Sequence, residues 1–290
     1  MQLSTIRNLA LAALVSIPCA ASAQGDTTKA AGQPTHVLRL KDGSTLMGHL
    51  ISSDSGGVRF ETMGNVLTVR RDRIAELTVV RDVDMHGTEY WFPDPNRTRL
   101  FFSPTARMLN KSEGYYSNTY LFLQNFAVGT SDQLTMGGGL SVFPTSNFLS
   151  DNVYYVTPKL GLYQSPENAV AVGALVGFVP ADNGHSGGIL YAVGTHGGEN
   201  ASVTGGLGYA FADGNFTPAP IMLFGGTDRV SRRIALVTEN YAYYHDGGGV
   251  VFSYGIRVMG EKLSADFAFW NSSGAHVFPG IPYVAFAVKF

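Results

Sequence analysis

The residue types that most often carry catalysis are sparse in this chain of 290 residues. His185 and Ser186 are adjacent in a predicted loop, where they offer a base beside a nucleophile. Neighbouring residues rarely hold the hydrogen-bond geometry that a base needs toward a third group. We therefore expect no catalytic residues, and a lipid-modifying hydrolase built on this pair is kept as an alternative.

The sequence gives little support for a metal site or for cysteine chemistry. The seven histidines are scattered, and no two have the short spacing of a metal site. The one cysteine, Cys19, lies in the apolar segment at the N-terminus, directly after Pro18. A lipid anchor would need a small residue before the cysteine, so we reject one. We expect neither a metal nor a cofactor.

A set of charged residues is the more specific candidate site. Each falls on the mixed face of a predicted strand, opposite the apolar face. If the strands close into a barrel, these residues face its lumen, where they set ion selectivity or form a structural network of ion pairs. The set comprises Arg99, Arg107, Lys159, Glu239, Arg257, Asp266 and Lys289.

The segment 250–270 shows the pattern best. Side chains alternate between the two faces of a strand, which puts Tyr254 and Ile256 on an oily face and Arg257 on the other. With a turn at 261–262, Arg257 lies across from Asp266, while Ile256 lies across from Phe267. One register therefore makes the ionic pair and the oily pairs together.

A regular series of such strands fills the C-terminal two thirds of the chain. About twelve are expected, with ten as the alternative, each roughly ten residues long as in membrane barrels. They lie near 98–107, 116–128, 133–143, 152–163, 168–179, 187–196, 200–211, 218–227, 232–244, 249–259, 263–271 and 282–290. Leu175 breaks the alternation in its strand, and Tyr241 indicates either a bulge or a misplaced boundary in strand 232–244.

The face opposite the oily one is mostly Gly, Ala, Ser and Thr, with too few charges for a water-exposed surface. Charged residues make up only 14% of the chain. We therefore predict an all-β fold, an antiparallel transmembrane barrel whose small residues line the lumen and whose oily face meets lipid. A soluble periplasmic β-sandwich that binds a ligand is the alternative.

The N-terminal third divides differently. Residues 1–23 form a predicted signal peptide, with Arg7, an apolar run and the small residues Ala21, Ser22 and Ala23. A flexible leader at 24–35, a small domain at 36–80 and a connector at 81–96 precede the barrel at 97–290. Five short strands in 36–80, with a turn at Asp42-Gly43, resemble a small SH3-like or Sm-like barrel.

Two resemblances concern the C-terminal part. The last strand, with Val288, Phe286 and the terminal Phe290, resembles the membrane-insertion signal of bacterial outer-membrane β-barrel proteins. Segments 98–107, 113–116 and 129–132 are similar to the opening of an uncharacterised group of such barrels. These resemblances imply location and fold, and no activity.

The predicted function is accordingly that of an outer-membrane β-barrel, either a structural barrel or a narrow passive channel. Longer odd-numbered connections and tight even-numbered ones put the small domain in the periplasm. The resemblance implies membrane lipid and the barrel-assembly machinery as partners. The net charge of −2 gives no case for nucleic acid.

Overall fold

The computed structural model describes residues 34–81, 84–87, 89–181, 184–244, 247–274 and 277–290. The chain divides into two compact units, Met1–Arg81 and Asp82–Phe290. The predicted signal peptide and most of the predicted leader lie outside the described residues. Among the residues that are described, no helix is long and apolar enough to cross a membrane.

The first unit is a five-stranded antiparallel sheet in the order β4-β3-β2-β1-β5. Its elements are β1 (Thr35–Leu40), β2 (Thr45–Ser53), β3 (Gly57–Thr62), β4 (Asn65–Arg70), the 3-10 turn η1 (Arg71–Arg73) and β5 (Ile74–Val79). A small core of Leu38, Val58 and Phe60 holds it together. Gly43 has a positive φ in the β1–β2 hairpin, as the Asp-Gly pair predicts.

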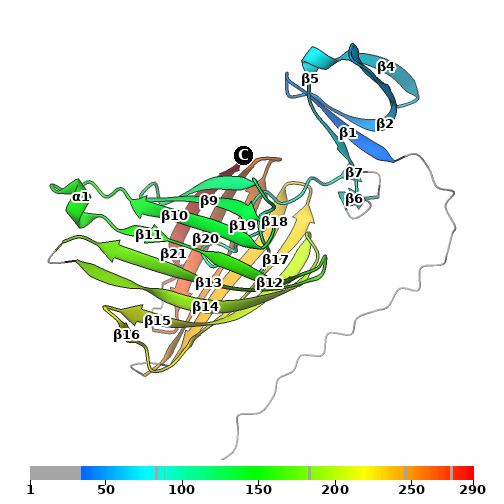
Figure 1. Ribbon diagram of the computed structural model, residues 1–290. Coiled ribbons are helices and arrows are strands. Elements are labelled where there is room, and N and C mark those ends of the chain that lie inside the picture. The colour runs from blue at the N-terminus through cyan, green and yellow to red at the C-terminus, as the bar shows by residue number, and fades with distance from the viewer. Residues whose placement is uncertain (1–33, 82–83, 88, 182–183, 245–246, 275–276) are drawn as a thin grey trace, which may run out of the picture. The chain divides into compact units, whose positions relative to one another are not determined.

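The second unit is a closed antiparallel barrel of twelve strands (Figure 1). This total takes β11 and β12 as one wall strand, because both pair with β10 and β13, and leaves out the short β16. The wall strands are β8 (Gly114–Thr119), β9 (Leu123–Ser131), β10 (Leu134–Ser141), β11 (Tyr154–Val156), β12 (Lys159–Gln164), β13 (Asn168–Val179), β14 (His185–Gly197), β15 (Ala201–Ala212), β17 (Ile221–Ser231), β18 (Ile234–Tyr243), β19 (Gly249–Met259), β20 (Leu263–Ser272) and β21 (Ile281–Lys289).

Four short elements lie outside this wall: β6 (Met85–His86), β7 (Glu89–Tyr90), α1 (Phe148–Asp151) and β16 (Asn215–Phe216). The barrel closes where the last strand β21 pairs with β8. At that seam Gly114 and Phe290 exchange two backbone hydrogen bonds, of 3.1 and 2.9 Å. The terminal residue therefore takes part in closure.

Two strand predictions were wrong, although the total is unchanged. Residues 98–107 form no wall strand; they are irregular, with a single bridge between Arg99 and Pro104. The predicted strand 116–128 is two strands, because Tyr120 and Leu121 adopt positive φ and turn the chain back on itself. One strand was thus lost and one gained.

The predicted hairpin is confirmed. Arg257 pairs with Asp266, and Ile256 pairs with Phe267. The predicted bulge at Tyr241 was wrong, since β18 keeps one register with β19 along its length. Tyr241 simply faces the barrel interior, where its hydroxyl donates to Glu239.

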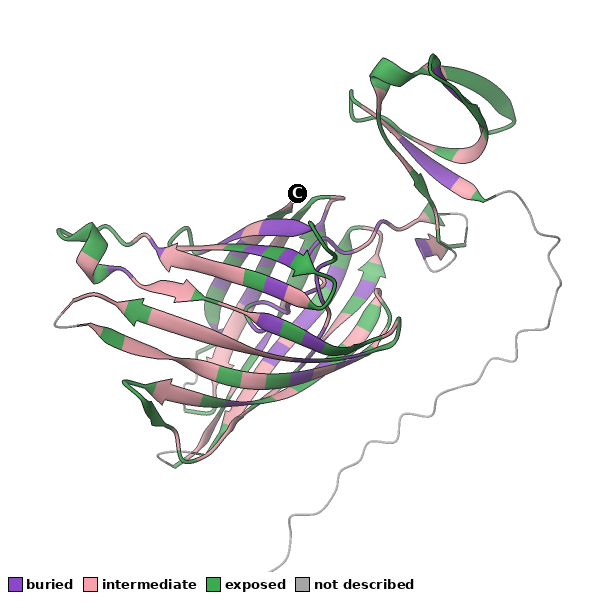
Figure 2. Cartoon of the chain, viewed as in Figure 1, coloured by how far each residue is buried: buried purple, intermediate pink, exposed green. Residues whose placement is uncertain are grey.

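The two faces of the wall differ as the alternation predicts, and Figure 2 shows buried and exposed residues alternating along the strands. Phe252, Ile256 and Phe267 are exposed at 41%, 39% and 47%, whereas Arg257 and Asp266 are at most 1% exposed. Large apolar side chains therefore cover the outside of the barrel. Charge is placed inside.

The small residues of the inner face allow close approach between strands. A Cβ built on Gly255, on the inner face, would lie 2.2 Å from the carbonyl oxygen of Phe267 and 2.5 Å from Cβ of Ala268. A Cβ on the outward Gly205 would meet nothing nearer than 3.9 Å. The inner wall thus has no room for a larger residue at 255.

We expect Gly255→Ala to lower the free energy of unfolding by about 1–3 kcal/mol, as overpacking of a filled interior does. Gly205→Ala, the matched control, should change it by less than about 0.5 kcal/mol. Urea unfolding of the protein folded into lipid vesicles measures both. Equal effects of the two substitutions would contradict the packing argument.

Candidate functional site

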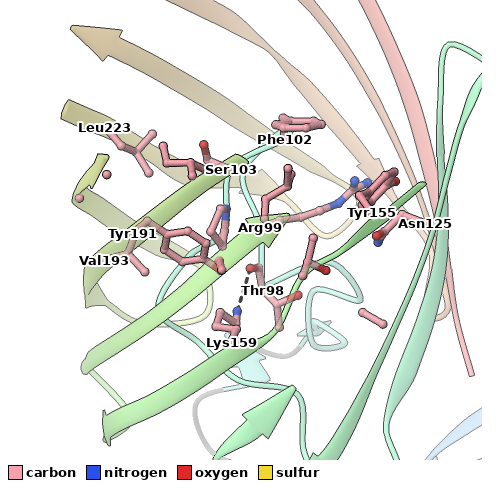
Figure 3. A pocket seen from close by; sticks show the side chains of 18 of the residues that line it. Thr98, Arg99, Phe102, Ser103, Asn125, Tyr155, Lys159, Tyr191, Val193 and Leu223 are labelled. Atoms are coloured by element: carbon pink, nitrogen blue, oxygen red, sulfur yellow. Dashed lines mark hydrogen bonds between the residues drawn. The ribbon is translucent and has the colours of Figure 1, made fainter. Parts of the chain in front are cut away.

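The candidate site is built around residues 94–109, which we call the inner segment. Its backbone and side chains contact inward residues of β12, β14, β18, β19 and β21. These five strands are spread around the barrel wall, and the residues contacted face inward, so the segment must lie inside the barrel to reach them all. Figure 3 shows Thr98, Arg99, Phe102 and Ser103 of this segment among wall residues such as Lys159 and Tyr191.

Arg257 is the central contact between the wall and the inner segment. Its Nε donates to Oδ1 of Asp266 at 2.7 Å, and Nη2 donates to Oδ2 at 3.1 Å. Nη1 donates to Asp94 at 3.3 Å and to the carbonyl of Asn96 at 3.2 Å, while Nη2 also reaches the carbonyl of Leu100. A fully buried guanidinium therefore has every direction of its fork occupied.

Glu239 binds the next part of the inner segment. Its Oε2 accepts the backbone N–H groups of Phe102 and Ser103 at 2.9 and 3.0 Å, and its Oε1 accepts the hydroxyl of Tyr241. The side chain is completely buried. This carboxylate therefore satisfies two backbone donors that have no sheet partner.

Lys159 binds the inner segment from the opposite side of the wall. Its Nζ donates to the carbonyls of Thr98, Thr105 and Arg107 at 3.4, 3.1 and 2.7 Å. On β14, the hydroxyl of Thr195 accepts the N–H of Ala106 at 2.9 Å. An ammonium group has three donors, and all three are used here.

Of the seven charged residues predicted to face the lumen, five lie on wall strands and two on the inner segment. Lys159, Glu239, Arg257 and Asp266 lie on wall strands and are buried. Arg99 and Arg107 lie on the inner segment, where Arg107 donates to the carbonyls of Pro166 and Gly197. Lys289 lies at the end of β21 and pairs with Glu113. Their contacts are those of a structural network, and a role in ion selectivity stays a prediction.

Glu113 joins both chain ends of the barrel. Its carboxylate accepts two hydrogen bonds from Arg97, at 2.7 and 2.8 Å, and lies 2.6 Å from Nζ of Lys289. Burial disfavours the charged carboxylate, but the hydrogen bonds and charge of Arg97, aided by Lys289, outweigh it and lower the pKa of Glu113 to about 2. Glu113 therefore links Arg97 of the inner segment to Lys289 of the C-terminal strand.

A cavity of about 260 Å³ lies between the inner segment and the wall. It reaches from Lys159 to Thr119 and Ile221, which are the terminal residues of β8 and β17 at the end of the barrel opposite the short turns. The inward Leu175, an exception to the small-residue face, is one of its walls. The inner segment, through Thr98, Arg99 and Phe102, lines the same cavity.

His185 and Ser186 do not form a nucleophile and base pair. Nδ1 of His185 lies 3.0 Å from a carboxylate oxygen of Asp213, whose other oxygen accepts the N–H of Ser186. The two side chains leave β14 on opposite faces, because they are neighbours in a strand. Residues 184–188 fit the letters Gly-x-Ser-x-Gly, but Ser186 lies within a strand rather than at a strand-to-helix turn.

The residues predicted as an insertion signal lie along the closing strand. Phe290 is 64% exposed and Val288 is 38% exposed, both on the outside of the barrel. Phe286 is half-buried, with its ring 6.0 Å from that of Tyr116. Their role as a signal stays a prediction.

Reasoning from the sequence missed the inner segment itself, and with it the wall residues that bind it, such as Thr195 and Tyr283. Tyr283 donates to the carbonyl of Phe101 at 2.9 Å. One signal was available: Pro104 stands in the middle of the supposed strand 98–107, and proline disfavours a central strand.

No protein-family model matches the chain, and no curated protein matches it. Among solved structures, it is similar to the NanC porin, with 10% identity and a TM-score of 0.40 over 61% of this chain and 97% of that one. The KdgM porin in complex with disordered oligogalacturonate gives 8% identity and a TM-score of 0.42, over 61% and 95%. The outer-membrane expressed OmpT of Vibrio cholerae gives 13% and 0.34, over 88% and 95%.

These neighbours are outer-membrane barrels, and the similarity is too low to transfer a ligand or a residue role. The chain's own geometry identifies a membrane-type β-barrel: a closed wall, an apolar outer face and charges confined to the interior.

The pKa of Glu113 predicts a loss of stability in acid. A folded-state pKa of about 2 lies below the ordinary value of 4.5, so Glu113 stabilises the fold fully above pH 4.5. That contribution is lost as the pH falls from 4.5 toward 2. We expect Glu113→Gln to be less stable than wild type at pH 7 and to show a shallower further loss in acid. Thermal unfolding at pH 7, 4 and 3 tests this, and parallel curves for the two proteins would contradict it.

Proposed function

We propose that this chain is an outer-membrane β-barrel with a structural role, whose lumen is closed to solutes because its own inner segment occupies it. The single observation that carries the proposal is the bonding of residues 94–109 to opposite sides of the wall through Arg257, Glu239 and Lys159. A permanently open channel would instead leave such charges facing water.

The outer face supports a membrane location. Residues such as Phe224, Phe252 and Phe267 are 64%, 41% and 47% exposed, and they recur on one face of successive strands. Exposing an apolar face of this extent to water is unfavourable, whereas in a bilayer the same face contacts lipid chains. The closed hydrogen-bonded wall leaves no edge strand, as spanning a bilayer requires.

The connections support the proposed orientation of the barrel. Turns at 132–133, 165–167, 198–200, 232–233 and 260–262 share one end of the barrel with the terminal Phe290. The connector reaches the same end, since Arg229, beside the turn 232–233, donates to the carbonyl of Phe92 at 2.7 Å. Short turns face the periplasm in such barrels, which supports a periplasmic N-terminal unit.

The N-terminal unit is proposed to be an SH3-like or Sm-like module. Five short antiparallel strands around Leu38, Val58 and Phe60 support this. Its partner is unknown. Membrane lipid, and the assembly machinery that reads the strand ending in Phe290, are the partners proposed for the barrel.

A paired substitution on β20 tests the membrane location. Phe267 lies at the middle of this strand and Leu263 at its short-turn end, and both side chains are about half exposed on the outer face. In a bilayer, Phe267→Arg should cost about 2–4 kcal/mol of unfolding free energy, and Leu263→Arg about 0–1 kcal/mol. Unfolding from vesicles measures both.

A soluble protein would give a different result: both substitutions would be tolerated, and the wild-type chain would be extracted without detergent. Either observation would reject the membrane proposal.

Planar-bilayer recording tests the closed lumen. We expect the wild-type barrel to show little steady conductance, and Lys159→Ala to show frequent openings, because three carbonyls of the inner segment lose their donor. Lys111→Ala removes an exposed cation outside the lumen and is the matched control. A large steady conductance from folded wild-type protein would reject the closed barrel.

A further inference from the structure

We propose that the cavity between the inner segment and the wall is a binding site for a small organic anion, a carboxylate carried on an aromatic or short apolar body. This goes beyond the closed-barrel proposal, which requires no ligand. The site is the cavity of about 260 Å³ that reaches the long-loop ends of the strands.

The anionic part of the ligand follows from Arg99. Its side chain is 9% exposed, and it lines the cavity. Nε donates to Asn96 at 2.8 Å and Nη1 donates to Ser117 at 3.4 Å, whereas Nη2 forms no hydrogen bond with the described residues. A buried guanidinium nitrogen without a hydrogen bond is costly, and a carboxylate is the acceptor that matches it best.

Other charges around the cavity do not take over this role. Asp266 lies 4.0 Å from Nη2 of Arg99, but both of its oxygens accept shorter hydrogen bonds from Arg257. Lys159 spends its three donors on the inner segment. The charged residues that line the cavity, Arg99 and Lys159, are both basic, so the site favours an anion.

Two further polar atoms point to the same ligand. Thr98 and Thr135 line the cavity, and their buried hydroxyls form no hydrogen bond with the described residues. A hydroxyl can donate to a carboxylate or accept from water. The three atoms belong to residues that line one cavity.

The remaining lining sets the body of the ligand. Tyr191, Leu175, Ile189 and Leu223 supply aromatic and aliphatic surface to the same cavity; Figure 3 shows Tyr191 and Leu223 on the wall. The volume lies just below the usual range for small-molecule pockets, about 300–1,000 Å³. A single ring or short chain fits such a space, and an oligosaccharide does not.

The test uses benzoate and its neutral analogue benzamide with the full chain in detergent, by isothermal titration. We expect wild type to bind benzoate about tenfold to a hundredfold more tightly than benzamide, the factor expected of a charge-assisted hydrogen bond. In Arg99→Gln this preference should vanish, while Arg99→Lys should keep part of it. Arg107→Gln removes a cation of the inner segment that does not line the cavity, and should leave the preference unchanged.

A second variant guards against a general effect of Arg99 on folding. Leu175→Trp enlarges another side chain that lines the cavity and leaves Arg99 unchanged. It should abolish the binding of both compounds, while the unfolding midpoint stays near that of wild type. Three results would overturn the proposal: no benzoate binding by folded wild type at millimolar concentration, equal binding of the two compounds, or an unchanged preference in Arg99→Gln. None of these results depends on conductance, so the proposal of a closed lumen is tested separately by planar-bilayer recording.

Discussion

A buried arginine inside a narrow barrel has no water to hydrate it, and this constraint organises the structure. Arg257 is fully buried, so its donors must end on protein acceptors. Asp266 neutralises its charge from the neighbouring strand, and carbonyls of the inner segment accept the remaining hydrogen bonds. Removing either partner would leave an uncompensated charge, which is far more costly than the net value of the pair.

The backbone of the inner segment also requires hydrogen-bond partners. An irregular chain inside a barrel cannot use a sheet ladder, so its N–H and C=O groups require side-chain partners. Glu239 accepts two N–H groups, Lys159 donates to three carbonyls, and Thr195 accepts one further N–H. The wall side chains and the segment backbone thus satisfy each other's hydrogen-bonding groups. The same mutual need explains why so few charges suffice for the interior.

Much of the wall was predictable because its physics is local. Alternation with period two fixes which residues face outward, and the register of the hairpin at Arg257 follows from matching oily and ionic pairs at once. The inner segment was not predictable in this way. Its residues have the length and composition of a strand, and what removes them from the wall is long-range: Glu239, Lys159 and Arg257 lie 50 or more residues away along the chain. Pro104 was the one local sign, and Tyr120 and Leu121 concealed a turn inside an apolar run.

The exceptions to the alternation have a common cause in the inner segment. In a barrel of twelve strands, small inward residues alone would leave the lumen open, because the interior is wider than that of an eight-stranded barrel, which side chains can fill. Once an irregular segment occupies one part of that lumen, the filling becomes uneven. Leu100 and Phe101 pack closely against Val237, Ala268 and Ala285, while space remains on the other side, where Leu175 and Tyr191 reach inward. Where the segment fits the wall the interior is filled, and where it does not a cavity is left that Arg99 helps to line. An irregular plug in a regular wall therefore creates a pocket as a consequence of its shape, and the deviations from the strand pattern mark where that pocket lies.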